Sequence, residues 1–447
     1  QAEAAVLSPD GRRLLIAAGA LHIIDTTSDT RLAELTTAGN TPTDVAVALD
    51  GSRAFVLSQA SRTLTAVDLN TNTVAGNPIT VPGLSSGVAV GPNGLVYVST
   101  VNLVQIIDGR TMTLLKEIQV NASPGKMIFT PDGLYGLAVN KTPITGTSLL
   151  MFDLAGQKLA GSIPQIQNVT IDRLVYAAGN RIYGISNQSA TLYQITTSPL
   201  NINPPEFGGL STLNNVTDLA VSGEVPNNRF LFVSTPGSMY RFDLSANPAL
   251  AAGQVAIPVQ PGPLVHLNAQ STGTPTGMLA YNTAQTTTPG GTYLPLIARV
   301  TNSVGRPLFG VNVTFTTDNP NATIQGATVT TNAEGWAQTT VVAPSTAGTF
   351  NVTATAGPGP NAPTSTYVLT TASGSTGGTT TGLMTIVSGQ GQMVSEQFLL
   401  RQPMLVRVRN SAGAPVSGQT VTFNLTAGSG TLSISTFAGE VLQGTTC

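Results

Sequence analysis

Four charged residues stand at the same point of a recurring sequence pattern and form the best candidate for a binding site in this chain. Asp44, Lys126, Arg173 and Asp218 each directly precede a short apolar run. If those runs line up around a common axis, the four side chains meet at one level of a ring, near a mouth of its central channel. Two acids and two bases there could clamp a polar or zwitterionic ligand; alternatively, they neutralise one another or point into water.

Residues suited to metal or covalent chemistry are scarce. His22 and His266 are the only histidines, and Cys447 is the only cysteine. They are too few for multi-histidine copper or zinc sites, and no P-loop, H-E-x-x-H or Ser/His/Asp order is present. A series of aspartates, in five of the six repeating units, is expected to cap turns, because calcium needs six to eight oxygens converging on one point. We therefore predict no catalytic residue, no metal site and no cofactor. The aspartates are Asp25, Asp68, Asp108, Asp153 and Asp243.

The apolar runs belong to a unit of four short strands that recurs along the first 260 or so residues. Copies read VAVALDG, AFVLS, LTAVD from Val45; VAVGPNG, VYVST, VQIID from Val88; and MIFTPDG, LYGLAV, LLMFD from Met127. The ends of the third runs are spaced by 43, 40, 45, 43 and 47 residues, a period typical of propeller blades. The runs are apolar on both faces, so each sheet must lie between two others, as it does in a ring of blades.

These units resemble the YVTN-type β-propeller repeat, with its pattern of VAVSPDG, VYV and V-IID-T-T. The resemblance covers roughly Glu3 to Pro261 and is looser in the last two of six units. It implies an all-β fold that begins with a six-bladed propeller. A seventh blade would need strands from before Gln1, because Pro263 to Tyr281 does not supply the pattern.

From Met278 onwards the repeat length becomes 108 residues. Gly305 and Gly413 are 108 apart, within the shared block N-x-x-G-x-P-x-x-G-x-x-V-T-F. Strands with Gly, Pro and Asn turns at about 100 residues per unit indicate β-sandwiches. This block and the segment TVTTNAEGWAQTTV resemble the bacterial Ig-like domains of the invasin and intimin type (Big-1), which implies rod-like spacers. Trp336, the only tryptophan, is expected to pack within the first sandwich, with a carbohydrate platform as the alternative.

The predicted organisation is a propeller at 1–267, a linker at 268–275, an Ig-like sandwich at 276–372, a flexible linker at 373–382 and a truncated second sandwich at 383–447. The first sandwich has 57 residues between Phe315 and Ala372, whereas the second has 24 between Phe423 and Cys447. Three explanations stay open: a fragment of a longer protein, a processed end, or strands donated by a neighbouring molecule.

Composition narrows the function. Charged residues make up 9% of 447 residues and the net charge is −2, against about 25% charged residues in typical soluble proteins. Neither nucleic acid nor an anionic membrane is an expected partner, and no apolar run approaches the roughly 18 residues of a membrane span. A single cysteine leaves no disulfide framework.

These features favour a non-enzymatic bacterial protein, secreted or at the cell surface, whose propeller is a binding or assembly head on an Ig-like stalk. Adhesion is the expected role, and the expected partners are other surface proteins, carbohydrate or copies of the chain, with strand exchange at the incomplete sandwich. Two alternatives remain open: a structural subunit of a surface layer or extracellular filament, and a propeller enzyme of lactonase or dehydrogenase type.

Overall fold

The computed structural model describes residues 2–36, 41–130, 132–141, 147–164, 171–177, 181–186, 191–197, 200–202, 215–221, 230–244, 250–256, 263–264, 271–303 and 305–372, and four short strands beyond them. The chain divides into two compact units, residues 1–344 with 349–370 and residues 345–348 with 371–447. Every regular element in the described residues is a β-strand, as the sequence predicts.

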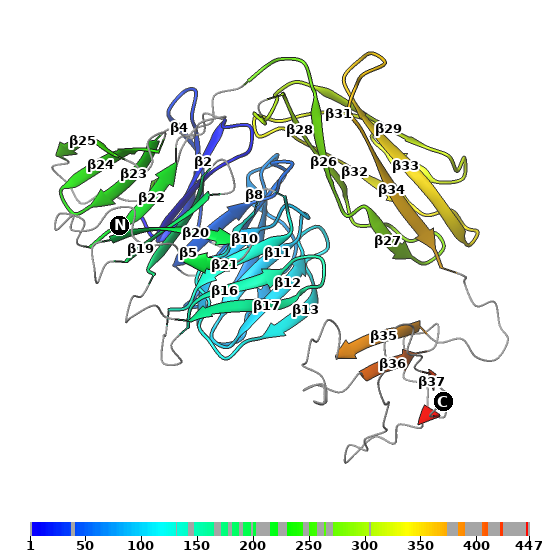
Figure 1. Ribbon diagram of the computed structural model, residues 1–447, viewed down its shortest axis with the longest axis horizontal. Helices are drawn as coiled ribbons and strands as arrows, with labels where there is room; N and C mark the ends of the chain where they lie inside the picture. The colour runs from blue at the N-terminus through cyan, green and yellow to red at the C-terminus, as the bar shows by residue number, and fades with distance from the viewer. Residues whose placement is uncertain are drawn as a thin grey trace. The chain divides into compact units, whose positions relative to one another are not determined.

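The first unit begins with six antiparallel sheets, each a meander of four strands in chain order, which we call blades 1 to 6 (Figure 1). Blade 1 holds β1 (Ala4–Leu7), β2 (Arg13–Ala18), β3 (Ala20–Asp25) and β4 (Thr30–Leu35); blade 2 holds β5 (Pro42–Val47), β6 (Arg53–Ser58), β7 (Thr63–Asp68), β8 (Thr73–Val74) and the extra strand β9 (Ile79–Thr80); blade 3 holds β10 (Ser85–Val90), β11 (Val96–Thr100), β12 (Leu103–Asp108) and β13 (Thr113–Gln119). Blade 4 holds β14 (Ile128–Phe129), β15 (Tyr135–Val139), β16 (Thr147–Asp153) and β17 (Lys158–Pro164); blade 5 holds β18 (Arg173–Ala177), β19 (Arg181–Ser186), β20 (Thr191–Thr197) and β21 (Leu200–Ile202); blade 6 holds β22 (Asp218–Val221), β23 (Phe230–Thr235), β24 (Ser238–Asp243) and β25 (Leu250–Ala256).

Hairpin turns join the first and second strands of the blades, and their chemistry repeats. Gly51 and Gly133 both have a φ of 71°, which a glycine adopts at little cost. In each turn the preceding aspartate accepts a hydrogen bond from the backbone N–H two residues later, at 2.9 Å for Asp50 and 3.0 Å for Asp132. The turns therefore fix the register of the innermost strand of each blade, which is the first.

The aspartates that end the third strands of blades 1 to 4 do cap turns, whereas most of the turn after Asp243 lies outside the described residues. Asp25 Oδ1 accepts hydrogen bonds from the backbone N–H groups of Thr27 and Ser28, at 2.8 and 3.0 Å. These bonds, that from Ser28 first, lower the pKa of Asp25. Asp68 makes the same pair of bonds. Each of these carboxylates is thus engaged with its own turn.

The apolar cores lie between blades rather than within them. One core joins Leu21 and Ile23 of blade 1 to Val45 and Val67 of blade 2. Successive cores join blades 2 and 3, 3 and 4, 4 and 5, and 5 and 6. Burying one Val, Leu, Ile or Phe side chain contributes about 1.5–3 kcal/mol, so each blade depends on its neighbours. The strands that are apolar on both faces explain this arrangement.

The first unit ends in a sandwich of two sheets. One sheet has the strand order β26 (Gly277–Tyr281), β28 (Leu296–Thr301), β32 (Trp336–Val342) and β30 (Thr323–Gln325); the other has the order β27 (Ala284–Thr287), β34 (Thr364–Thr371), β33 (Gly348–Ala356), β29 (Asn312–Thr317) and β31 (Thr328–Thr330). Their inner faces share one apolar core that includes Phe315, Phe350 and Tyr367. The Tyr367 hydroxyl donates a hydrogen bond to the Ile297 carbonyl across the sandwich, at 2.7 Å.

In the second unit, β35 (Leu383–Ser388) pairs antiparallel with β36 (Leu405–Arg409), and β37 (Val421–Thr422) pairs parallel with β38 (Gly444–Thr445). The rest of the predicted second sandwich, and the predicted linker at 373–382, lie outside the described residues. No helix long and apolar enough to cross a membrane occurs in the described part of the chain.

Candidate functional site

Asp44 and Lys126 come together at the start of the inner strands, although 82 residues separate them. Lys126 Nζ donates to Asp44 Oδ1 at 2.7 Å and to the Val45 carbonyl at 3.3 Å. The buried Asp44 carboxylate also accepts from the backbone N–H groups of Val45 and Val88, each at 2.9 Å. Asp44 therefore ties the inner strand of blade 2 to those of blades 3 and 4.

Asp218 plays the same role at the sixth blade with a different neighbour. Its carboxylate accepts from the backbone N–H groups of Leu219 at 2.9 Å and of Leu264 at 2.8 Å. The backbone N–H of Leu264 thus binds Asp218 as that of Val88 binds Asp44, although Leu264 lies in no described strand. In the described part of the chain, no hydrogen bond or ion pair joins Asp218 to Lys126 or Arg173.

Arg173 is exposed near the Asp44–Lys126 pair, and so is Lys141, a lysine that does not directly precede a first strand. Lys141 Nζ donates to the Ser86 carbonyl at 3.4 Å. Burial by the surrounding protein and the charge of Arg173 lower the pKa of Lys141, and the charge of Asp44 partly opposes them. We call Asp44, Lys126, Lys141 and Arg173 the inner-strand cluster.

Lys141 could have been found from the topology. It directly follows the second strand region of blade 4, which runs antiparallel to the first. The end of a second strand therefore lies at the same edge of the blade as the start of a first strand. Because Lys141 follows a second strand, it does not appear among the residues that precede the first strands.

The opposite edge of the propeller contacts the first sandwich, through the turns between the first and second strands of blades 2, 3 and 4. In blade 2, Asn332 Nδ2 donates to the Leu49 carbonyl at 2.7 Å, and Gln338 Nε2 donates to Asp50 Oδ2 at 2.6 Å. In blade 3, Asn282 Nδ2 donates to the Asn93 carbonyl at 2.9 Å. We call this contact the junction.

Apolar groups complete the junction. Gly133, in the turn of blade 4, lies so close to the Tyr281 ring that a Cβ there would overlap it. Burial raises the pKa of Tyr281 to about 12. Leu294 of the sandwich packs against the core between blades 3 and 4. The sandwich therefore docks onto the propeller through packed side chains as well as hydrogen bonds.

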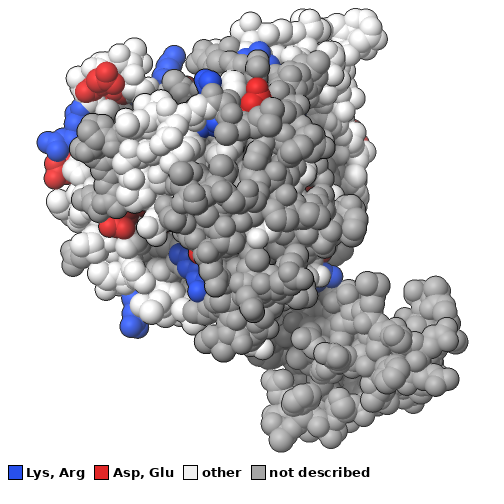
Figure 2. Space-filling model, turned by 60° about the vertical axis from the view of Figure 1, so that its left-hand side comes forward, with Lys and Arg blue, Asp and Glu red and all other residues white. Residues whose placement is uncertain are grey.

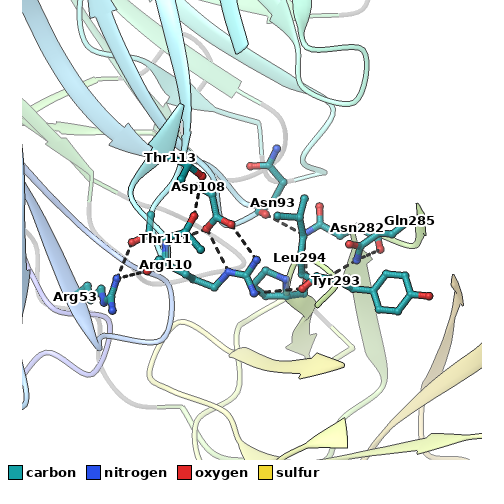
Figure 3. Close-up of polar contacts among 12 residues, drawn as sticks. Arg53, Asn93, Asp108, Arg110, Thr111, Thr113, Asn282, Gln285, Tyr293 and Leu294 are labelled. Atoms are coloured by element: carbon teal, nitrogen blue, oxygen red, sulfur yellow. Dashed lines mark hydrogen bonds and ion pairs between the residues drawn. The ribbon is translucent and has the colours of Figure 1, made fainter. Parts of the chain in front are cut away.

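Arg110 links blade 3 to the sandwich (Figure 3). Its Nε and Nη2 donate to the two oxygens of Asp108, at 3.2 and 3.0 Å, while Nη1 donates to the Tyr293 carbonyl at 3.2 Å. Arg53 donates to the Gly109 carbonyl at 3.0 Å and the Arg110 carbonyl at 2.6 Å. The guanidinium of Arg110 is thereby held by one domain and bound to the other.

Trp336 packs beside the junction, in the turn motif NAEGW. Its ring lies 5.5 Å from that of Tyr281, and the Arg299 guanidinium lies 5.1 Å from its ring. Its Nε1 donates to Glu334 Oε2 at 3.3 Å. Burial raises the pKa of Glu334, and Arg299 and Trp336 partly oppose that shift. Trp336 is a packing residue, as expected, and its position makes it a reporter of the junction.

The described residues contain no group of three or more His, Cys, Asp or Glu side chains placed to hold a metal ion. Their other charged side chains are sparse and scattered in small groups over the face that Figure 2 shows. Among the described residues, the inner-strand cluster and the junction are the groups of polar side chains considered further.

Residues 277–388 match the bacterial Ig-like domain family (group 1). The chain contains a bacterial Ig-like domain that follows a β-propeller in the sequence. Among solved structures, the β-propeller domain of Cps50 (Swd1) from Myceliophteria thermophila is similar over 68% of this chain and 94% of its own, with a TM-score of 0.51 and 12% identity. At that identity the likeness shows the fold alone.

Hydrazine synthase from Kuenenia stuttgartiensis is similar over 55% of this chain and 77% of its own, with a TM-score of 0.48 and 19% identity. No curated protein matches the chain by sequence. The family match and the likeness to the Cps50 propeller bear out the predicted Ig-like and propeller folds.

Proposed function

We propose that this chain is a non-enzymatic binding or assembly protein that acts outside the bacterial cell, with the propeller as its head and the Ig-like region as its spacer. The bacterial Ig-like domain supports this proposal, because such domains are typical of surface proteins. Fold alone does not fix function, so the proposal depends mainly on the geometry of the first unit.

The junction is the observation that carries the proposal. Its hydrogen bonds and the packing of Tyr281 and Leu294 fix the sandwich to one edge of the propeller. The inner-strand cluster lies at the other edge, five residues away along β5, or roughly 17 Å at about 3.3 Å per residue. Lys126, Lys141 and Arg173 are exposed at that edge, so a partner could reach them while the spacer holds the other edge.

Protease treatment of intact cells of the source bacterium tests the location. We expect proteolysis to cleave the chain before the cells are lysed, while a cytoplasmic marker protein survives. A chain that is protected until lysis would contradict the proposal. Electron microscopy of the released material then separates isolated adhesive molecules from regular arrays or filaments.

A further inference from the structure

The two acids of the predicted clamp are already occupied. Two backbone N–H groups and Lys126 satisfy the buried Asp44 carboxylate, and two backbone N–H groups satisfy that of Asp218. Such carboxylates hold neighbouring inner strands together. They have little capacity left to bind the positive end of a zwitterionic ligand.

The three cations retain hydrogen-bond donors. The exposed guanidinium of Arg173 carries five N–H groups, and no described residue accepts from them. Lys126, whose side chain is 45% exposed, uses two of its three ammonium donors. Lys141 has one long contact to Ser86. Unlike the acids, these groups can reach a ligand from solvent.

The cations also lie close to one another. Lys141 contacts the Ser86 carbonyl, and the next residue, Gly87, lies against the backbone of Lys126 so tightly that a Cβ would come within 2.6 Å of its Cα. Arg173 begins β18, which contacts β14 and β15, the strands that Lys126 precedes and Lys141 follows. Burial, and after it the charge of Arg173, lower the pKa of Lys141. Like charges placed close together destabilise the fold, and an anion bound among them would relieve that repulsion.

We infer that the inner-strand cluster binds an anionic group, a carboxylate or a phosphate, on a small ligand or at the end of a longer molecule. Arg173 supplies the planar pair of donors that can bind two oxygens at once. Lys141 and Lys126 supply point charges, and Asp44 holds Lys126 in place. The inference rests on the proposed role of the propeller as a binding head and names the chemistry that this head recognises.

A long polyanion fits the chain less well than a single anionic group. Binding a polyanion requires cations spread along its length. Here the net charge is −2 and only 9% of residues are charged, and the described residues on the face in Figure 2 carry scattered charges of both signs. The excess of cations in the inner-strand cluster, three against the single carboxylate of Asp44, is confined to one edge of the inner strands.

Isothermal titration calorimetry of the intact chain with citrate and with inorganic phosphate, at constant ionic strength adjusted with sodium chloride, tests the inference. We expect at least one anion to bind with a Kd of about 1 mM or below. Lys141→Gln and Arg173→Gln should each weaken that binding by roughly tenfold or more, because each removes a charge-assisted hydrogen bond. Arg12→Gln, an exposed cation in the turn after β1, serves as the matched control and should leave binding unchanged.

The two anions separate the two chemistries: a response to citrate alone indicates a carboxylate ligand, and a response to phosphate alone indicates a phosphate ligand. Either supports the inference. The site is wrong if neither anion binds at about 10 mM, or if the Arg12 variant loses as much affinity as the other two. Such a result would leave the extracellular location untouched, since protease treatment of intact cells tests that independently.

Discussion

The two edges of the propeller's inner strands recognise their surroundings by different chemistry. The junction edge uses backbone carbonyls, neutral amides and packed rings, with Arg110 as the main ionised contributor. The opposite edge gathers three cations around one carboxylate. Neutral contacts suit a partner in the same chain, because they are desolvated once, during folding.

The exposed cations at the opposite edge suit a different kind of partner. Removing an ionised group from water is costly unless a partner compensates, so exposed cations are better suited to a partner that binds and leaves. Electrostatic attraction also raises association rates more than it raises affinity. From this difference we expect a permanent contact at the junction edge and reversible binding at the edge that holds the inner-strand cluster. The variants below test that division, beginning with the largest expected effect.

Gly133→Val should disrupt the junction most. A β-branched residue is strained at a φ of 71°, and its Cβ would overlap the Tyr281 ring. Together the strain and the overlap should cost about 3 kcal/mol or more. The fluorescence of Trp336, the only tryptophan, should shift as its neighbour Tyr281 moves. Gly51→Val is the control, because its φ is also 71° while a Cβ there meets only Pro9 at 3.7 Å. Equal effects of both variants would show that backbone strain alone is responsible.

Asp44→Asn tests whether the other edge is also structural. The amide would present N–H groups where the carboxylate now accepts from Val45, Val88 and Lys126. An unsatisfied buried group costs about 1–3 kcal/mol, so the midpoint of thermal unfolding should fall clearly. Lys126→Met should cost less, because that ammonium is half-exposed. If both variants unfold at the wild-type temperature, the carboxylate does not hold the blades together.

Much of the fold could be read from the sequence because its physical causes are local and repeated. Runs such as Val45 to Ala48 are apolar on both faces, so their sheets must be stacked, and the glycine turns mark where each strand reverses. Alignment of the repeats also placed Asp44 and Lys126 at one level, and they do form an ion pair. Arg173 lies at the same level, near Lys141.

The residues of the junction could not be recognised from the sequence. Gly94 and Gly133 are each required by the turn itself, so their second role, a close approach to Ile297 and Tyr281 of the sandwich, adds no signal. Asn332 likewise caps its own turn through Oδ1 while its amide nitrogen reaches Leu49. The partner of Asp218, Leu264, lies beyond the last recognisable repeat. When one residue both shapes its own turn and contacts another domain, a single sequence reveals only its role in the turn.

Arg110→Ala should weaken the junction by about 1–2 kcal/mol, because it removes one interdomain hydrogen bond to the Tyr293 carbonyl and leaves Asp108 without its partner. The effect can be followed by chemical unfolding monitored by Trp336 fluorescence. Arg110→Lys should restore little, since one ammonium cannot reproduce the three contacts of the guanidinium. Arg31→Ala removes an exposed ion pair with Glu34 and should cost well under about 1 kcal/mol. An Arg110 variant no less stable than the Arg31 variant would mean that this contact is dispensable.

Lys141→Gln should have the smallest effect and the opposite sign. Because the pKa of Lys141 is lowered in the folded chain, the unfolded state binds more protons between that lowered pKa and the ordinary 10.5. The contribution of Lys141 to stability therefore rises as pH increases through this window. At pH 7 the variant should be at least as stable as the wild type, by less than about 1 kcal/mol because the group is exposed and screened.

Towards pH 10 the advantage of the Lys141→Gln variant should shrink, because the wild-type lysine then loses its proton within the fold. Unfolding in denaturant at both pH values measures this difference, with Asp44 and Arg173 unchanged in both proteins. A variant that is more stable yet binds anions more weakly would show that the chain retains this charge for its ligand rather than for its fold. A variant that is less stable at pH 7 would make Lys141 a structural residue and would erase the contrast between the two edges.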